Sequence, residues 1–153
     1  DILSLHYYEE RSDFMLIIKE VEYAVMILDE LYQESPLSAA ALSARRNIPS
    51  PFIYRVLKKL EAQDILEIRR GPKGGYSLKA DCEKLTLYDV ISAFENTFIV
   101  TECLKSDYEC VHNNDFNCRM HRQFAWIQHL LKAEFEKKSL ASLLERDEES
   151  ETE

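Results

Sequence analysis

The apolar positions of the chain form a series of helical patterns, which one pair of short strands interrupts. Between residues 15 and 33, apolar side chains recur every three or four positions, which predicts a long helix that ends near Pro36. An alanine-rich helix is expected over 39–46, with Ser38 as its N-cap. The next three residues are expected to form a turn, in which Ile48 contributes to the core.

The stretch from Arg45 to Lys79 carries the most informative pattern. Apolar residues with the spacing of one buried helical stripe follow Pro51, at Phe52, Ile53, Val56, Leu57 and Leu60. We expect Ser50 to be the N-cap and Pro51 to occupy the first helical position, where its missing N–H costs nothing. Two short strands and the glycine-rich turn between them are predicted at residues 65–68, 76–78 and 71–75.

The C-terminal half combines helices with one segment of weak periodicity. A helix is predicted from Leu87 to about Glu95, preceded by a capping box of Thr86 and Asp89. Residues 96–117 are polar and show little periodicity. A long helix over 119–138 is predicted by an apolar stripe at Met120, Phe124, Ile127, Leu130, Leu131 and Phe135. Ser139 can cap a last helix over 140–144.

Charge changes the picture, because the bases are concentrated in one stretch of an acidic chain. The whole chain carries a formal net charge of −9, whereas Arg45 to Lys79 contains nine bases and three acids, or 9 − 3 = +6. A basic helix beside a basic hairpin fits the major groove and the adjacent phosphates of DNA. The alternative is a solvated basic face with no ligand.

The same stretch resembles the helix-turn-helix and wing of the Rrf family of bacterial winged-helix regulators, which includes IscR- and NsrR-like members. The resemblance is carried by Ile48-Pro49, Leu57, Leu60 and Ile65-Leu66, and above all by the wing sequence RGPKGGYSL at 70–78. It implies a mostly α fold with a small β-hairpin. The implied segments are an N-terminal extension with no assigned role (1–14), a winged helix-turn-helix domain (15–95), a cysteine-bearing sensor loop (96–118), a dimerisation helix with a short terminal helix (119–144) and an acidic tail expected to be disordered (145–153).

The resemblance also assigns DNA contacts. It directs four residues of the recognition helix at bases or nearby phosphates: Ser50, Pro51, Tyr54 and Arg55. Phosphate contacts are expected from Lys58, Lys59, Arg69 and Lys73, and Arg70 and Gly74 lie in the wing, where Arg70 can enter the minor groove. Several relatives carry an acidic residue at the Tyr54 position, and because a tyrosine cannot accept hydrogen bonds in the same way, their operator sequence does not transfer.

The cysteines form a second candidate site. Cys103, Cys110 and Cys118 are spaced C-x6-C-x7-C, and His121 follows the last of them as C-x2-H. Thiolates suit an iron–sulfur cluster or zinc, and the spacing alone leaves a metal site open. In the iron–sulfur members of the family this loop holds the cluster, with shorter spacings. His121 then matches the fourth ligand of a [2Fe–2S] cluster, which we favour slightly, and Glu22 of the partner subunit matches that of a [4Fe–4S] cluster.

These observations favour a DNA-binding transcription regulator whose operator affinity is set by an iron–sulfur cluster, acting as a homodimer on a palindromic operator. The alternatives are a cluster-free regulator controlled by thiol chemistry or a partner protein, one with structural zinc, and a winged helix that binds only proteins. An enzyme is not expected, because no nucleophile or phosphate-loop motif is present. With no apolar run of about 18 residues and no signal peptide, we expect a cytoplasmic protein without a membrane span.

Overall fold

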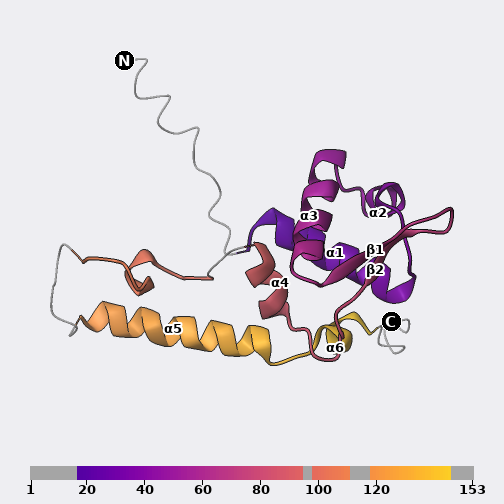
Figure 1. Cartoon of the computed structure of the whole chain (residues 1–153). Coiled ribbons are helices and arrows are strands. Elements are labelled where there is room, and N and C mark those ends of the chain that lie inside the picture. Colours follow the sequence, from indigo (N-terminus) through magenta and orange to yellow (C-terminus); the bar gives the residue numbers. More distant parts are fainter. Residues whose placement is uncertain (1–16, 95–97, 111–117, 146–153) are drawn as a thin grey trace, which may run out of the picture.

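The computed structural model describes residues 17–94, 98–110 and 118–145, and it is mostly helical with one antiparallel hairpin (Figure 1). This confirms the predicted fold class. The elements are α1 (Lys19–Gln33), α2 (Ala39–Arg46), α3 (Ser50–Ala62), β1 (Leu66–Arg69), β2 (Gly75–Leu78), α4 (Leu87–Phe94), the 3₁₀ turn η1 (Glu102–Leu104), α5 (Arg119–Glu136) and α6 (Leu140–Leu144). The expectations for residues 1–14 and for most of the acidic tail lie outside the described residues.

Helix α1 lies at the centre of the core. Its buried face packs against α2, α3, α4 and α6, and Ala24, Ile27 and Leu28 are fully enclosed. Ile48, in the turn between α2 and α3, is buried as predicted. Because each fully buried aliphatic side chain contributes about 1.5–3 kcal/mol, this one helix fixes the relative positions of the others.

Three predicted caps are confirmed. The Ser38 hydroxyl accepts the N–H of Ala41 at 3.1 Å, and the Ser139 hydroxyl accepts the N–H of Ser142 at 3.2 Å. Thr86 and Asp89 form the reciprocal capping box, because the Thr86 N–H donates to the Asp89 carboxylate at 2.8 Å and the Asp89 N–H donates to the Thr86 hydroxyl at 3.3 Å. Each cap satisfies donors that the first helical turn leaves without partners.

The predicted N-cap of the recognition helix is wrong. Helix α3 begins at Ser50 itself, and Pro49 is the capping residue, so that Pro51 falls one position later than expected. The extended Pro49 backbone turns its carbonyl toward the N–H groups of Phe52 and Ile53, which donate to it at 2.9 and 3.2 Å. The Ser50 side chain makes no cap hydrogen bond and is left on the exposed N-terminal turn.

The hairpin is tied to the segment that precedes α2. Leu66 pairs with Leu78 and Arg69 with Gly75, and Tyr76 exchanges two backbone hydrogen bonds with Leu37, at 2.8 and 3.0 Å. Gly75 has a φ of +153°, and a Cβ there would lie 2.5 Å from the Leu37 carbonyl oxygen. The glycine therefore allows the start of β2, next to the hairpin turn, to approach the segment that precedes α2 closely.

Helix α5 extends away from the rest of the molecule, along α4 and the segment that contains η1 (Figure 1). It ends at Glu136, two residues before the predicted end. The chain then returns to the body, where the Leu140 and Ala141 N–H groups donate to the carbonyls of Leu85 and Cys82. None of the described helices has the length and apolar character needed to cross a lipid bilayer.

A cluster of ion pairs joins α1 to the end of α2. Glu30 accepts hydrogen bonds from Arg46 Nε at 2.6 Å and Arg45 Nη1 at 3.2 Å, and Arg46 also pairs with Asp29. Burial favours the neutral Glu30 carboxyl, but the two guanidinium groups outweigh this effect, and its pKa is lowered. Glu30 therefore stabilises the fold as a carboxylate.

We expect the Glu30→Gln substitution to lower the free energy of unfolding by about 1–3 kcal/mol near neutral pH. Because the folded pKa is depressed, this stabilisation is present above the unfolded pKa of about 4.3 and is lost as the pH falls through the folded value. Urea unfolding in a pH series from about 7 to about 3, which passes below the unfolded pKa, should show the difference from the wild type shrinking toward acid. Asp64→Asn, which breaks the exposed pair with Lys79, should cost less than about 1 kcal/mol.

Candidate nucleic-acid interface

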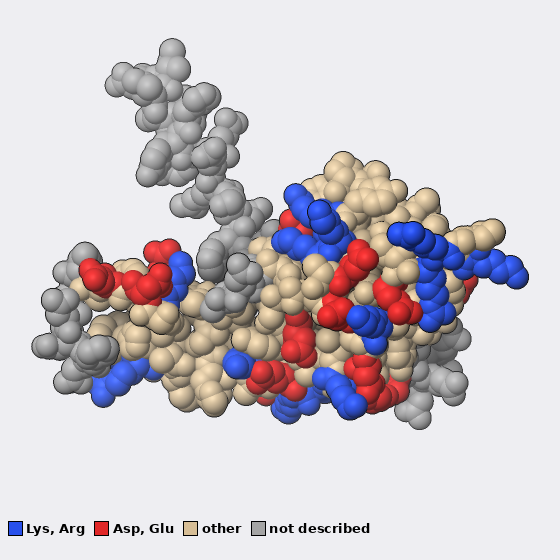
Figure 2. All heavy atoms as spheres, in the orientation of Figure 1, with Lys and Arg blue, Asp and Glu red and all other residues tan. Residues whose placement is uncertain are grey.

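Helix α3 and the hairpin present one side of the molecule to solvent. The helix buries Ile53, Val56 and Leu57, and it leaves Tyr54 58% exposed on the opposite side. Ser50 and Pro51 are exposed at its N-terminal turn, and Gly74 lies in the hairpin turn. Figure 2 shows Lys and Arg side chains over α3 and along the hairpin, with acidic groups among the bases elsewhere on this face. This surface has the size and shape of a groove-binding helix with a neighbouring wing.

Ion pairs reduce the charge that the sequence predicted for this surface. Five of the nine bases between residues 45 and 79 pair with carboxylates: Arg45 with Glu30 and Glu34, Arg46 with Asp29 and Glu30, Arg55 with Glu20, Arg69 with Glu67, and Lys79 with Asp64. The value of +6 therefore overstated the positive charge available to a ligand. Four of the six partner carboxylates, Glu20, Asp29, Glu30 and Glu34, precede the stretch in the chain, so a local sum could not include them.

Four bases form no ion pair with any described residue: Lys58, Lys59, Arg70 and Lys73. Lys59 is held over the Phe94 ring, with its Nζ 5.2 Å from the ring centroid, and is partly buried. Lys58, Arg70 and Lys73 are exposed. These three side chains are the freest positive charges of the candidate interface, and they are suited to phosphates.

The three loop cysteines lie at different places along α5 and the segment before it. Cys103 belongs to η1, Cys110 ends the described part of the loop, and Cys118 is the residue that precedes α5. Each is partly exposed, and each is a free thiol. Among the described residues, no three His, Cys, Asp or Glu side chains lie close enough together to hold a metal ion. Residues 111–117, between Cys110 and Cys118, lie outside the described residues.

The fourth cysteine is different. Cys82 is buried against the core, and burial, followed by the charges of Asp81 and Glu83, raises the pKa of its thiol. It therefore stays a neutral thiol at physiological pH, as expected for a structural residue.

The two candidate fourth ligands lie on separate helices. His121 is on the first turn of α5, just after Cys118. Glu22 is on the first turn of α1, where it pairs with Lys19 of the same chain. A role for Glu22 as a ligand would require that it exchange this lysine for a metal.

Gln128 was not found by sequence reasoning. Its side-chain amide donates to the Phe98 carbonyl and accepts the Val100 N–H, both at 2.8 Å, and Phe98 packs edge-on against Phe135 at 5.4 Å between ring centroids. These contacts fasten the start of the cysteine loop to the middle of α5. No sequence signal marked it, because a glutamine on a helix is usually solvated.

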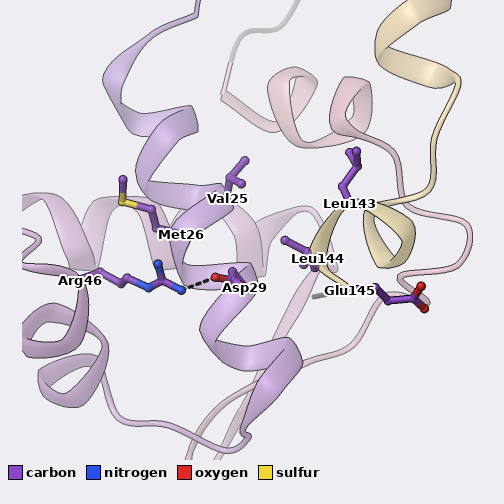
Figure 3. A pocket seen from close by; sticks show the side chains of 7 residues that line it. All are labelled: Val25, Met26, Asp29, Arg46, Leu143, Leu144 and Glu145. Carbon is purple, nitrogen blue, oxygen red and sulfur yellow. Dashed lines mark hydrogen bonds and ion pairs between the residues drawn. The ribbon is translucent and has the colours of Figure 1, made fainter. Parts of the chain in front are cut away.

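A hollow of about 360 Å³ lies between α1 and α6 (Figure 3). Val25, Met26 and Asp29 of α1 line one side, and Leu143, Leu144 and Glu145 the other. Arg46 reaches its edge, where it pairs with Asp29. Because these two charges satisfy each other, the pair belongs to the contact between α1 and α2, and it does not point to a ligand.

The recognition helix, the hairpin wing and the bases on both define a winged helix-turn-helix protein of the transcription-regulator class. The sequence model of the Rrf2 family, described as an iron-dependent transcriptional regulator, matches residues 17–146. The chain belongs to this family, as the wing motif indicated. It is therefore a transcription regulator and not an enzyme.

Named relatives agree with this assignment. A putative HTH-type transcriptional regulator of Aquifex aeolicus is 24% identical over 88% of this chain and 94% of its own length. The regulator IscR of Vibrio campbellii is 31% identical over 46% of this chain and 42% of its own length.

Solved structures share the fold. The IscR of T. potens has a TM-score of 0.67 at 18% identity, and covers 90% of this chain and 91% of its own. CymR of B. subtilis, named the global cysteine regulator, has a TM-score of 0.66 at 20% identity, and covers 86% of this chain and 97% of its own.

Neutralising the free bases should weaken DNA binding in a salt-dependent way. For the triple variant Lys58→Gln, Arg70→Gln and Lys73→Gln, we expect the slope of log affinity against log salt to fall by about 2 to 3 for each subunit that contacts a mixed-sequence duplex, because each phosphate contact contributes about 0.9. Fluorescence anisotropy at several salt concentrations measures it.

The matched control is the triple variant Lys84→Gln, Lys105→Gln and Lys137→Gln. It replaces three exposed, ion-paired lysines outside this surface. It lowers the net charge equally and should leave the slope within about 0.5 of the wild type. Equal slopes for both triple variants would mean that the surface of α3 and the hairpin does not contact phosphates.

Proposed function

We propose that this regulator binds an operator in double-stranded DNA through α3 and the hairpin, and that the thiols of the loop before α5 control this binding. The observation that supports it most is that α3, whose opposite face is buried in the core, and the adjacent hairpin together expose the bases Lys58, Arg70 and Lys73, which form no ion pair with any described residue. The family supports the regulatory role.

The roles within the interface follow from exposure and charge. Ser50, Pro51, Tyr54 and Arg55 occupy the exposed side of the first two turns of α3, the part of a recognition helix that contacts base edges. Lys58, Lys59 and Lys73 are suited to phosphates, and Arg70 to the minor groove. Arg69 contributes less charge than expected from sequence, because Glu67 lies 3.0 Å from its guanidinium.

A homodimer is part of the proposal. No residue of α5 is buried in the single chain, and Met120 and Trp126 are 58% and 56% exposed. An amphipathic helix whose apolar residues are only partly covered usually packs against another surface, and a second copy of α5 would cover the remainder. A twofold dimer would present two α3 helices to a palindromic operator.

An iron–sulfur cluster is the sensor that we propose for the loop. The chemistry of the donor set, with three thiols and either His121 or Glu22 of the partner subunit, suits such a cluster. A cluster would supply a group sensitive to oxidation, iron supply or nitric oxide. The described side chains of one chain do not converge on one point, so the loop would have to close on Cys118 for the ligands to meet.

Contacts within the chain support a route by which such closure would act on DNA binding. Gln128 and Phe98 hold the start of the loop on α5, and Cys118 is joined directly to the first turn of that helix. A rearrangement of the loop between Phe98 and Cys118 would therefore shift α5. Helix α5 packs against α4, which in turn contacts α1 and α3. A coupling free energy of about 1–3 kcal/mol along this route is enough to change operator occupancy.

A cluster-free mechanism is the second candidate. Cys103, Cys110 and Cys118 are all partly exposed, which allows direct thiol oxidation, and the fold is shared with the cysteine regulator CymR. Structural zinc on the three cysteines and His121 is a third use of the same side chains.

Purification without oxygen distinguishes these candidates. We expect a brown protein with a visible absorption band and with iron and acid-labile sulfide in comparable amounts. Cys103→Ser, Cys110→Ser and Cys118→Ser should each abolish the colour, whereas Cys82→Ala should keep it, because Cys82 lies outside the loop and is buried. Comparing His121→Ala with Glu22→Gln identifies the fourth ligand.

A colourless protein that holds one zinc per chain would contradict the cluster and support structural zinc. A colourless, metal-free protein whose DNA affinity changes on mild oxidation would support thiol control instead. DNA binding is measured separately in each case, so that the regulator and its sensor are tested independently.

The dimer is tested by the mass in solution. Sedimentation should give twice the mass of one chain, and Trp126→Glu should raise the dimer dissociation constant at least about tenfold, because it places a charge in the proposed interface. Leu143→Glu changes an exposed leucine on α6, away from α5, and should leave the dimer intact. A monomeric wild type would contradict the assembly.

A further inference from the structure

We infer that Glu20 is a positioning residue for operator recognition: it holds the Arg55 guanidinium in place to read a guanine edge, and it thereby sets sequence specificity more than overall affinity. The inference rests on the proposed function of α3. It assigns Arg55 a different role from the other bases of the interface.

The Arg55 side chain lies in a cradle built by two helices. Its Nη2 is 2.9 Å from Glu20 Oε1, and its guanidinium carbon lies 4.7 Å from the centroid of the Phe52 ring. Phe52 is itself braced by Tyr23, edge-on at 5.7 Å between centroids. Glu20 and Tyr23 belong to α1, which is anchored in the core, and the arginine side chain remains 50% exposed. The cradle therefore fixes the guanidinium while leaving part of it accessible.

The cradle leaves most of the guanidinium donors available. A guanidinium has five N–H groups in a planar fork, and Glu20 contacts it at one nitrogen. A fork that is already fixed loses less conformational entropy when it forms two parallel hydrogen bonds. The O6 and N7 atoms of guanine in the major groove accept such a pair, and this contact discriminates against other bases by about 1–3 kcal/mol.

Charge favours a base over a phosphate at this position. The carboxylate of Glu20 repels a phosphate that approaches Arg55, whereas the acceptor edge of guanine carries no net charge. Lys58 and Lys73 have no acidic partner among the described residues, so phosphates are attracted to them. The pairing with Glu20 thus separates the one base-reading arginine from the phosphate contacts.

Other paired arginines lack this combination. Arg46 is engaged by both Asp29 and Glu30, at Nη2 and at Nε, and it lies on α2, outside the recognition helix. Arg69 pairs with Glu67 of its own strand, and no described aromatic ring stacks on it. Only at Arg55 does the described structure show an aromatic base, one carboxylate and an exposed remainder on the recognition helix.

The experiment measures specificity, not affinity alone. Dimeric wild-type protein is used to select a preferred sequence from a randomised duplex library. Dissociation constants are then measured for that duplex and for a scrambled duplex of the same composition. For Glu20→Gln, we expect the ratio of the two constants to fall about tenfold, while binding to the scrambled duplex stays unchanged or tightens, because a negative charge has been removed.

Glu61→Gln is the matched control, because Glu61 is an exposed acid on the same recognition helix that makes no contact with Arg55. This variant should tighten binding to both duplexes by the same factor, so the ratio of the two dissociation constants should stay at the wild-type value. Arg55→Lys keeps the charge but removes the fork, so it should lower the ratio at least as much as Glu20→Gln. The double variant should be no worse than Arg55→Lys alone, since the two residues act as one unit.

If Glu20→Gln and Glu61→Gln gave the same ratio of dissociation constants, the inference would be overturned, because Glu20 would then act only through its charge. A circular dichroism spectrum and melting temperature like those of the wild type exclude unfolding as the cause of a lowered ratio. A wild type that selects no sequence would overturn the proposed function and this inference together, whereas a selective wild type with an unaffected Glu20→Gln variant would overturn this inference alone.

Discussion

The burial of one face of α1 is the constraint on which the rest of the structure depends. Every other helix of the body packs on this face, so the orientation of the recognition helix is set by how its own apolar stripe meets α1. The polar side of the same helix organises the charges, because Glu20 pairs with Arg55 and Glu30 with Arg46. One helix therefore both builds the core and decides which arginines remain available to a ligand.

The sequence predicted the local elements well, because helices, caps and the hairpin depend on residues that are near one another in the chain. The capping box of Thr86 and Asp89 and the glycine turn of the wing are examples. The Ser50 cap was wrong because the preceding proline already directs its carbonyl into the first turn, and a serine pattern does not reveal this. The charge of the interface was overstated because the neutralising acids Glu20, Asp29 and Glu30 lie earlier in the chain and meet the bases only after folding.

The candidate sensor was predictable as a set of thiols, but its attachment to the fold was not. Cysteine spacing and family resemblance identified the loop, whereas the amide of Gln128, which fastens the loop to α5, follows no pattern that a sequence reveals. The long helix was recognised from its stripe, and the structure adds that none of its side chains is buried within one chain. The cysteine loop and the exposed helix are thus joined by direct hydrogen bonds.

The two backbone hydrogen bonds between Leu37 and Tyr76 have a consequence for how the interface can evolve. They make residue 37 a one-residue extension of the wing's sheet, so the angle between hairpin and recognition helix depends on a position that is itself buried. A change in the backbone around Leu37 would swing the hairpin relative to α3 without altering any exposed side chain. The reach of the protein across a DNA groove could in this way diverge between relatives whose DNA-facing residues are identical.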